Sequence, residues 1–373
     1  MQTTYRHILQ FVCATVAVIM MTGALNFTVD PLQLLRPAGF YHPMYSNDSR
    51  MQNAGLIRSQ DFDTVFMGTS LAIHFRQSDI DRLVGGRSLK LAMSGSDSHE
   101  QSFVLAAVLE RHPKRVIWQM DDWIFRAAPD IDTNPFLPAN LYRRNARGLG
   151  EYLFSGAMAR ESLWMIARSI KPLEKTVARL TSGIVIKFPI ADADDINALA
   201  PNYDVAGFYN AQKAMASFVQ ITDLARRSDL AAGYDYDTMV GIFERDAIGL
   251  IEKNPNVKFD IYFPPYSILQ FVAMRDASPV TLKIVYDFTA YAASRLIGFP
   301  NVSLHDFRDV KEITHNLGNY GDVIHHSPAI DLKVLSLIAE RKHVVDRSAP
   351  LASLERLKAQ VEAYRRGQQK TSP

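Results

Sequence analysis

The stretch Thr64-Val65-Phe66-Met67-Gly68-Thr69-Ser70 decides the fold, because an apolar run ends there in a glycine and two hydroxyl residues. A short apolar run of this kind is typical of a buried strand. A short helix is predicted next, with its cap near Ser78 or Asp79. The glycine, threonine and serine would then stand at the carboxyl end of a strand, where open parallel sheets bind ligands.

The same alternation of strands and helices continues along the chain. Helices are predicted over 98–111, 281–296 and 329–340. Four further strands are predicted at Leu89–Met93, Arg115–Met120, Val257–Phe263 and Val302–Phe307. Residues 61–345 are therefore predicted to form a three-layer α/β/α domain with a central, mostly parallel five-stranded sheet that is covered on both faces.

About 130 residues separate the third predicted strand from the fourth, which is far more than one crossover needs. Helical patterns near 150–180, 208–227 and 237–253 indicate a helical insertion at about 140–255. The helices are separated by Ile190-Ala191-Asp192-Ala193-Asp194-Asp195 and by Pro201-Asn202-Tyr203. Such an insertion either roofs a binding site or is a structural elaboration, and the pattern fits both.

The N-terminal segment Ile8–Phe27 is a run of twenty uncharged residues. As a helix it would extend roughly 30 Å, the thickness of a bilayer core. Arg6 before the segment and Asp30 after it favour a cytoplasmic N-terminus and an exported remainder. A cleaved signal peptide is the alternative, but Thr22–Asn26 makes a poor cleavage site, which favours an uncleaved anchor over residues 1–29.

Two further segments flank the predicted domain. Residues 30–60 contain Pro31, Pro37 and Pro43 and are interpreted as an irregular juxtamembrane connector. Residues 346–373 are interpreted as a C-terminal tail that forms a frayed helix and then becomes disordered.

Composition excludes several classes of function. Cys13, the only cysteine, lies in the apolar segment, so the rest of the chain has no disulfide, cysteine nucleophile or thiolate metal site. The net charge of +2, from 41 basic and 39 acidic residues, provides no basic stripe for nucleic acid. The basic patch Arg143-Arg144-Asn145-Ala146-Arg147 is either a solvated surface or a contact for anionic glycan or lipid headgroups.

Ser70 is a candidate nucleophile, and its partners are predicted far along the chain. A serine hydroxyl near neutral pH needs a base beside it and a third group that orients the base. Asp322-Val323-Ile324-His325 can supply both from one local turn, with His325 as base and Asp322 as its acid partner. The backbone N–H of Ser70 would face the oxyanion that forms on attack.

These pieces resemble the SGNH (GDSL-like) hydrolase superfamily, and more closely its membrane-anchored bacterial branch that includes cell-envelope polysaccharide O-acetyltransferases. Gly68-Thr69-Ser70 resembles the nucleophile block, Ser94-Gly95-Ser96 the block with the oxyanion glycine, and Asp322-Val323-Ile324-His325 the terminal block. The resemblance covers residues 61–342 in the same order. The third block, Gly-x-Asn-Asp, would follow the third strand, where this chain has Asp121-Asp122-Trp123.

The resemblance implies an enzyme that transfers an acyl group, most simply acetyl, to or from a cell-envelope or exported polysaccharide through a serine acyl-enzyme. It implies that the backbone N–H of Gly95 is a second oxyanion donor beside that of Ser70, and that the enzyme needs no cofactor. It also implies a single-pass inner-membrane protein with a periplasmic catalytic domain, and a multi-span membrane acyltransferase as partner. Transferase and esterase both remain open. The alternative class is a non-catalytic scaffold or glycan-binding subunit of a polysaccharide export complex.

Several side chains are candidates for substrate binding. Asp121 and Asp122 either bind sugar hydroxyls or cap the next turn. Trp123 is either a sugar-stacking platform or a core aromatic. Tyr266 follows Pro264-Pro265 and is expected near the ligand edge, and His326 is expected to line the site. No metal site is predicted, because no two of His74, His99, His305 and His315 have metal-ligand helical spacing.

Overall fold

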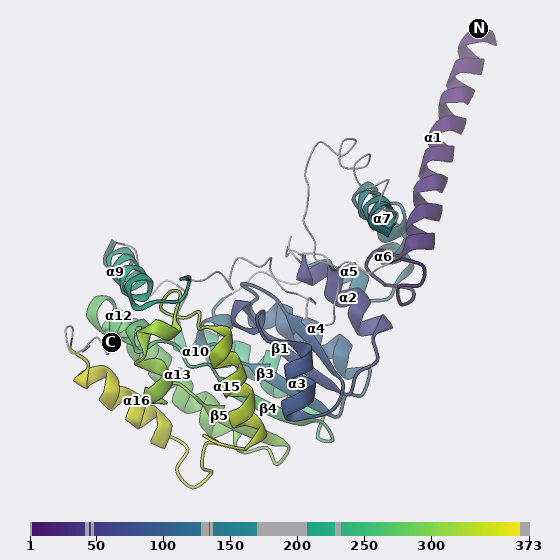
Figure 1. Cartoon of the computed structure of the whole chain (residues 1–373). Helices are drawn as coiled ribbons and strands as arrows, with labels where there is room; N and C mark the ends of the chain where they lie inside the picture. The colour runs from purple at the N-terminus through teal and green to yellow at the C-terminus, as the bar shows by residue number, and fades with distance from the viewer. Residues whose placement is uncertain are drawn as a thin grey trace. The chain divides into compact units, whose positions relative to one another are not determined.

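The chain folds as two compact units in the computed structural model, which describes residues 2–41, 45, 48–127, 134, 137–169, 207–227 and 233–365 (Figure 1). The first unit comprises 1–61 and 135–197, and the second comprises 62–134 and 198–373. The predicted insertion is thus divided between the units, because its first helices pack on the N-terminal segment.

The second unit contains a five-stranded, all-parallel sheet with strand order β2-β1-β3-β4-β5. This confirms the predicted fold class. Every strand begins and ends within one residue of its predicted bounds. The strands are β1 (Thr64–Gly68), β2 (Ser88–Ala92), β3 (Arg115–Gln119), β4 (Lys258–Phe263) and β5 (Val302–Asp306).

One face of the sheet is covered by α3 (Gln77–Val84) and α15 (Pro328–Ala339), which pack against each other (Figure 1). Phe66, Ile117 and Tyr262 project from neighbouring strands into this layer and form one buried apolar cluster with residues of both helices. Pro328 is the first residue of α15, because its missing N–H and fixed φ suit that position.

The opposite face is covered by α4 (Ser98–Leu109) and α13 (Pro279–Leu296). Trp118 on β3 donates its indole N–H to Gln101 Oε1 of α4 at 2.8 Å. α13 contacts β5 and α10 (Tyr236–Phe243). Because both faces are covered, the central strands are apolar without alternation, which is why they are recognisable as short apolar runs.

The remaining helices of the second unit extend this scaffold. A π-helical turn (Glu244–Ile248) joins α10 to α11 (Gly249–Lys253), and α9 (Ala211–Arg227) packs against α12 (Ile268–Ala277). The sequence patterns near 208–227 and 237–253 predicted these segments except α12. The predicted spacers Ile190–Asp195 and Pro201-Asn202-Tyr203 lie outside the described residues.

The C-terminal segment differs from its prediction. Residues 352–363 form α16 (Ala352–Ala363), whose Leu354, Leu357 and Val361 are buried in a cluster with residues of α12 and α13. Three apolar side chains at spacings of three and four residues make one helix face, and burial of that face stabilises the segment as part of the domain.

The first unit is helical and contains α1 (Gln2–Val29), α2 (Ser49–Ser59), α5 (Ala139–Tyr142), α6 (Ala146–Leu153) and α7 (Gly156–Ser169). Residues Thr4–Val29 of α1 are long and apolar enough to span a membrane. The carboxyl end of α1 is held by Asn26, which donates to Leu153 O at 2.8 Å and accepts from Ser162 Oγ at 3.0 Å. The predicted connector contains a regular helix, α2, and is therefore not irregular throughout.

Candidate active site

The carboxyl ends of β2, β1 and β3 lie side by side at the topological switch point of the sheet. The chain passes from β1 to β2 on one side and then crosses to β3 on the other side of β1. The crevice outside such a switch point is where open α/β sheets bind ligands. Gly95, Ser70 and Asp121 follow these three strands in that spatial order.

Gly68 sets the position of the nucleophile turn. Its carbonyl accepts the Met93 N–H at 2.9 Å, which joins the ends of β1 and β2. A Cβ atom at this position would lie 2.4 Å from Gln119 Oε1 and 2.8 Å from the Cβ of Ala72. Only glycine therefore allows the turn that begins at Thr69 and Ser70 to pack this closely on β3.

Ser70, His325 and Asp322 converge in the structure. Ser70 begins a short 3-10 turn (Ser70–Ala72) directly after β1, and its Oγ lies 2.9 Å from His325 Nε2. His325 Nδ1 lies 2.6 Å from Asp322 Oδ2. A carboxylate at Nδ1 favours the tautomer in which Nδ1 carries the proton and Nε2 accepts the serine hydroxyl. This is the arrangement that a base-activated serine requires.

One carboxylate both shapes the histidine turn and orients the histidine. Asp322 Oδ1 accepts the backbone N–H of Ile324 at 2.8 Å and that of His325 at 2.7 Å, while Oδ2 faces the imidazole. The turn is closed by Gly321 N–H, which donates to His325 O at 2.9 Å. Burial opposes the charged form, but the hydrogen bonds and charge of His325 outweigh it and lower the pKa of Asp322.

The three side chains remain accessible. The side chain of His325 is 22% exposed and that of Asp322 is 35% exposed, and Ser70 is half-buried. A ligand can therefore reach the serine without displacing the core.

Gly95, which is predicted to be the second oxyanion donor, lies in the loop after β2. It has a φ of +64°, a conformation that glycine adopts without strain, and a Cβ built on it would meet nothing within 4 Å. The next residue, Ser96, is buried, and its Oγ accepts from Gln101 Nε2 at 3.0 Å. The loop after β2 is thus fixed from α4 while open space remains beside Gly95.

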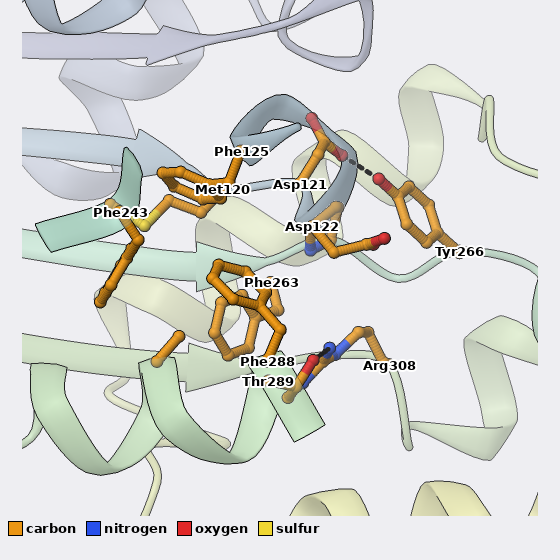
Figure 2. Close-up of a pocket in the computed structure, with 12 residues that line it drawn as sticks. Met120, Asp121, Asp122, Phe125, Phe243, Phe263, Tyr266, Phe288, Thr289 and Arg308 are labelled. Atoms are coloured by element: carbon orange, nitrogen blue, oxygen red, sulfur yellow. Dashed lines mark hydrogen bonds between the residues drawn. The ribbon is translucent and has the colours of Figure 1, made fainter. Parts of the chain in front are cut away.

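Asp121 is buried and supports the nucleophile turn from β3. Its Oδ2 accepts from Thr69 Oγ1 at 2.8 Å and from Gln119 Nε2 at 2.7 Å, and its Oδ1 accepts from the hydroxyl of Tyr266 (Figure 2). Burial raises the pKa of Asp121 to about 6, although these three hydrogen bonds favour the ionised form. Asp121 and Tyr266, both predicted to bind substrate, therefore bond to each other inside the domain.

Asp122 borders a small internal cavity of about 10 Å³, which has room for about one water molecule. Figure 2 shows Phe125, Phe243, Phe263 and Phe288 gathered around this space. Burial raises the pKa of Asp122, while Arg308 and Arg126 partly offset that effect.

Arg308, which was not predicted from the sequence, supports the same region. Its guanidinium makes two 2.8 Å contacts with the carboxylate of Asp306 and donates to Thr289 Oγ1 at 3.0 Å. Asp306 also accepts from Ser353 Oγ at 2.9 Å, which links α16 to the end of β5. Both charges are buried, so only their pairing makes their burial tolerable. The sequence signal that could have indicated this pair was the presence of two opposite charges, Asp306 and Arg308, at the end of β5.

Trp123 and His326, the other two residues predicted to bind substrate, lie in different surroundings. Trp123 lines a pocket of about 270 Å³ that also borders Asp322. His326 is buried next to the histidine of the triad, and its Nδ1 lies 2.9 Å from Asp331 Oδ1. It therefore faces the interior rather than Ser70.

The histidines considered as metal ligands have separate partners. His99 lies 3.1 Å from Asp246, His305 Nδ1 lies 2.8 Å from Lys342 O, and His315 makes an edge-on contact with Tyr364. Within the described ranges, no three His, Cys, Asp or Glu side chains are grouped so that they could hold a metal ion.

The chain matches no protein-family model, and no curated protein is significantly similar to it. A serine hydroxyl against an imidazole that is oriented by a carboxylate can attack a carbonyl carbon and pass its proton to the histidine.

Proposed function

We propose that the protein is an acyl-transferring enzyme that works through a covalent acyl-serine at Ser70. The observation that carries this proposal is the Ser70–His325–Asp322 chain of contacts at 2.9 and 2.6 Å. Its position supports the proposal as well, because it lies at the switch point of a parallel sheet.

The proposed reaction has two halves. Ser70 Oγ attacks the carbonyl carbon of an ester while His325 Nε2 takes the hydroxyl proton, and the same proton then passes to the leaving alcohol. In the second half, His325 takes a proton from an acceptor hydroxyl or water, whose oxygen attacks the acyl-serine carbonyl. The bond between the acyl carbon and Ser70 Oγ then breaks, and His325 passes the proton to Oγ. The backbone N–H groups of Ser70 and Gly95 stabilise the oxyanion in both halves.

As substrate we propose a cell-envelope or exported polysaccharide that gains or loses acetyl groups. The support is the resemblance of Gly68-Thr69-Ser70 and Asp322-Val323-Ile324-His325 to the SGNH blocks, together with a helix that can span a membrane. In this proposal α1 anchors the protein in the inner membrane, the second unit lies in the periplasm, and a multi-span membrane acyltransferase supplies the acyl group.

The test is hydrolysis of an aryl acetate by the detergent-solubilised full chain. Ser70→Ala is expected to reduce turnover by about three or more orders of magnitude, because removal of a triad nucleophile leaves only residual catalysis. Ser294→Ala is the matched control, since Ser294 is exposed on α13 and its hydroxyl donates to Ala290 O, one helical turn earlier. Equal turnover in Ser70→Ala and the parent would remove Ser70 from the mechanism.

A second candidate function is a non-catalytic scaffold or glycan-binding subunit of a polysaccharide export complex. One observation favours it: the loop after β3 carries the carboxylate of Asp121 where the resemblance expects an asparagine. The two functions predict different acyl-ester contents for the polysaccharide that is exported by a strain carrying Ser70→Ala. An enzyme predicts loss of its acyl esters with export retained, whereas a scaffold predicts no change in ester content.

A further inference from the structure

A pocket of about 270 Å³ lies next to the acid of the triad, within the second unit. Its volume is close to the lower end of the range of small-ligand sites, about 300 to 1,000 Å³. It is lined by residues of α9 and α12, which pack against each other (Figure 1), and by the turns that hold Trp123 and Asp322. The proposed reaction leaves this pocket without an occupant.

Arg126 is the cation that lines the pocket, and two aromatic rings flank it. Its guanidinium carbon lies 5.8 Å from the ring centre of Trp123 and 5.1 Å from that of Tyr234. Its Nε donates to Trp123 O at 3.1 Å. Both aromatic residues line the same pocket. The guanidinium is thus held in place, and holding it before a ligand arrives lowers the entropic cost of binding.

Asp322 is the acid that lines the pocket, and it is already engaged. Its two carboxylate oxygens accept the imidazole N–H of His325 and two backbone N–H groups. Asp122 lies near enough to Arg126 for the guanidinium to lower its pKa, although burial raises it overall. Asp122 does not line this pocket but borders the smaller internal cavity. Among the residues that line the larger pocket, Arg126 is therefore the positively charged side chain that can pair with an anionic ligand.

We propose that this pocket is a carbohydrate subsite that takes an acidic sugar residue of the acceptor chain, with Arg126 paired to its anionic group and Trp123 beside its ring. The planar guanidinium binds carboxylate and phosphate groups through two parallel hydrogen bonds. The inference rests on the proposed function, because it places this acidic sugar next to the sugar residue that reacts at Ser70. Asp322, which lines the pocket, contacts His325, and His325 contacts Ser70.

An acyl chain is a less suitable occupant for this pocket. Met274 and Ile324 supply apolar lining, but a hydrocarbon chain would remove water from Arg126 and offer it no hydrogen bond. Burying a charge without a compensating partner is costly. A sugar ring instead provides apolar C–H faces for Trp123 and hydroxyl groups for Gln270, which also lines the pocket.

The experiment compares trigalacturonate with maltotriose, two trisaccharides that differ in charge, by calorimetric titration of the detergent-solubilised full chain. The chain carries Ser70→Ala so that binding is measured without turnover. We expect trigalacturonate to bind about tenfold or more tightly, because a hydrogen bond to a charged group is worth at least that factor. Arg126→Gln should remove the preference. The control Arg82→Gln, on an exposed arginine that pairs with Asp79, should keep it.

Three outcomes would overturn the inference: no binding of either sugar, equal binding of both, or a preference that survives Arg126→Gln. Binding of methyl hexanoate, an uncharged acyl ester, in place of trigalacturonate would assign the pocket to an acyl chain and overturn it as well. If Arg126→Gln does not fold, Arg126→Lys carries the test, because it keeps the charge, loses the planar fork and should weaken the preference. Loss of aryl acetate turnover bears only on the proposed function, whereas the sugar titration bears only on the pocket.

Discussion

The hydroxyl of Thr69 donates to the carboxylate of Asp121 at 2.8 Å and so links the turn after β1 to the turn after β3. Thr69 directly precedes the candidate nucleophile, so this bond fixes the backbone that carries Ser70. Gln119 and Tyr266 donate to the same carboxylate. Three hydrogen-bond donors around one carboxyl group favour the ionised form of Asp121, although burial raises its pKa to about 6.

We expect Asp121→Asn to change how stability depends on pH. A carboxyl whose pKa is raised by folding contributes stability that is complete below its unfolded pKa of about 4 and is lost as the pH rises through the folded value. For Asp121 the folded value is about 6. The parent should therefore lose on the order of 2 kcal/mol more than the variant between pH 4 and 7. Urea unfolding at several pH values measures this, and parallel curves would contradict it.

We expect His325→Gln and His326→Gln to separate turnover from stability. His325 is partly exposed and faces Ser70, so its loss should abolish turnover of an aryl acetate and leave unfolding almost unchanged. His326 is buried beside Asp331, so its replacement should lower the free energy of unfolding by about 1 to 3 kcal/mol. Loss of turnover only in folded His326→Gln would mean that the adjacent histidine is the base.

The buried pair of Asp306 and Arg308 is expected to matter for stability. Asp306→Asn leaves a buried guanidinium without its counter-charge and should lower the free energy of unfolding by about 3 to 5 kcal/mol. The exposed pair of Lys283 and Asp287 is the matched control, and Asp287→Asn should change stability by less than about 0.5 kcal/mol. Similar losses in the two variants would contradict the assignment.

The proposed topology predicts that a reporter active only outside the cytoplasm works when fused after Arg365. The fusion point follows α16, because that helix packs into the second unit and truncation before it would expose Leu354 and Leu357. Mass spectrometry of the purified protein should find Met1–Phe27 retained. A mature N-terminus near Asn26 would show a cleaved signal peptide instead.

The strands and the turn that holds Asp322 and His325 could be predicted because their signals are local. Each central strand is buried on both faces, so it stands out as a short apolar run such as Thr64–Met67. The spacing of Asp322 and His325 is set by one turn, which the side chain of Asp322 itself stabilises.

The roles of Asp121 and Tyr266 could not be predicted, because sequence position does not show which way a side chain points. Both stand at the ends of strands, where function concentrates, yet they bond to each other in the interior. α12 was missed, and α16 was predicted only as a frayed helix in the tail, for a related reason. Their burial depends on contacts with each other and with α13, which no local pattern contains.

The most direct test of the account is covalent labelling of the full-length protein by a fluorophosphonate, which reacts with base-activated serines. Mass spectrometry of the digested protein should locate one adduct on Ser70, because His325 Nε2 lies 2.9 Å from its Oγ. The adduct should be lost in Ser70→Ala and strongly reduced in His325→Gln, with Ser294→Ala labelled like the parent. An unlabelled Ser70 in a folded protein, or equal labelling of His325→Gln, would contradict the claim that these residues form a working nucleophile and base.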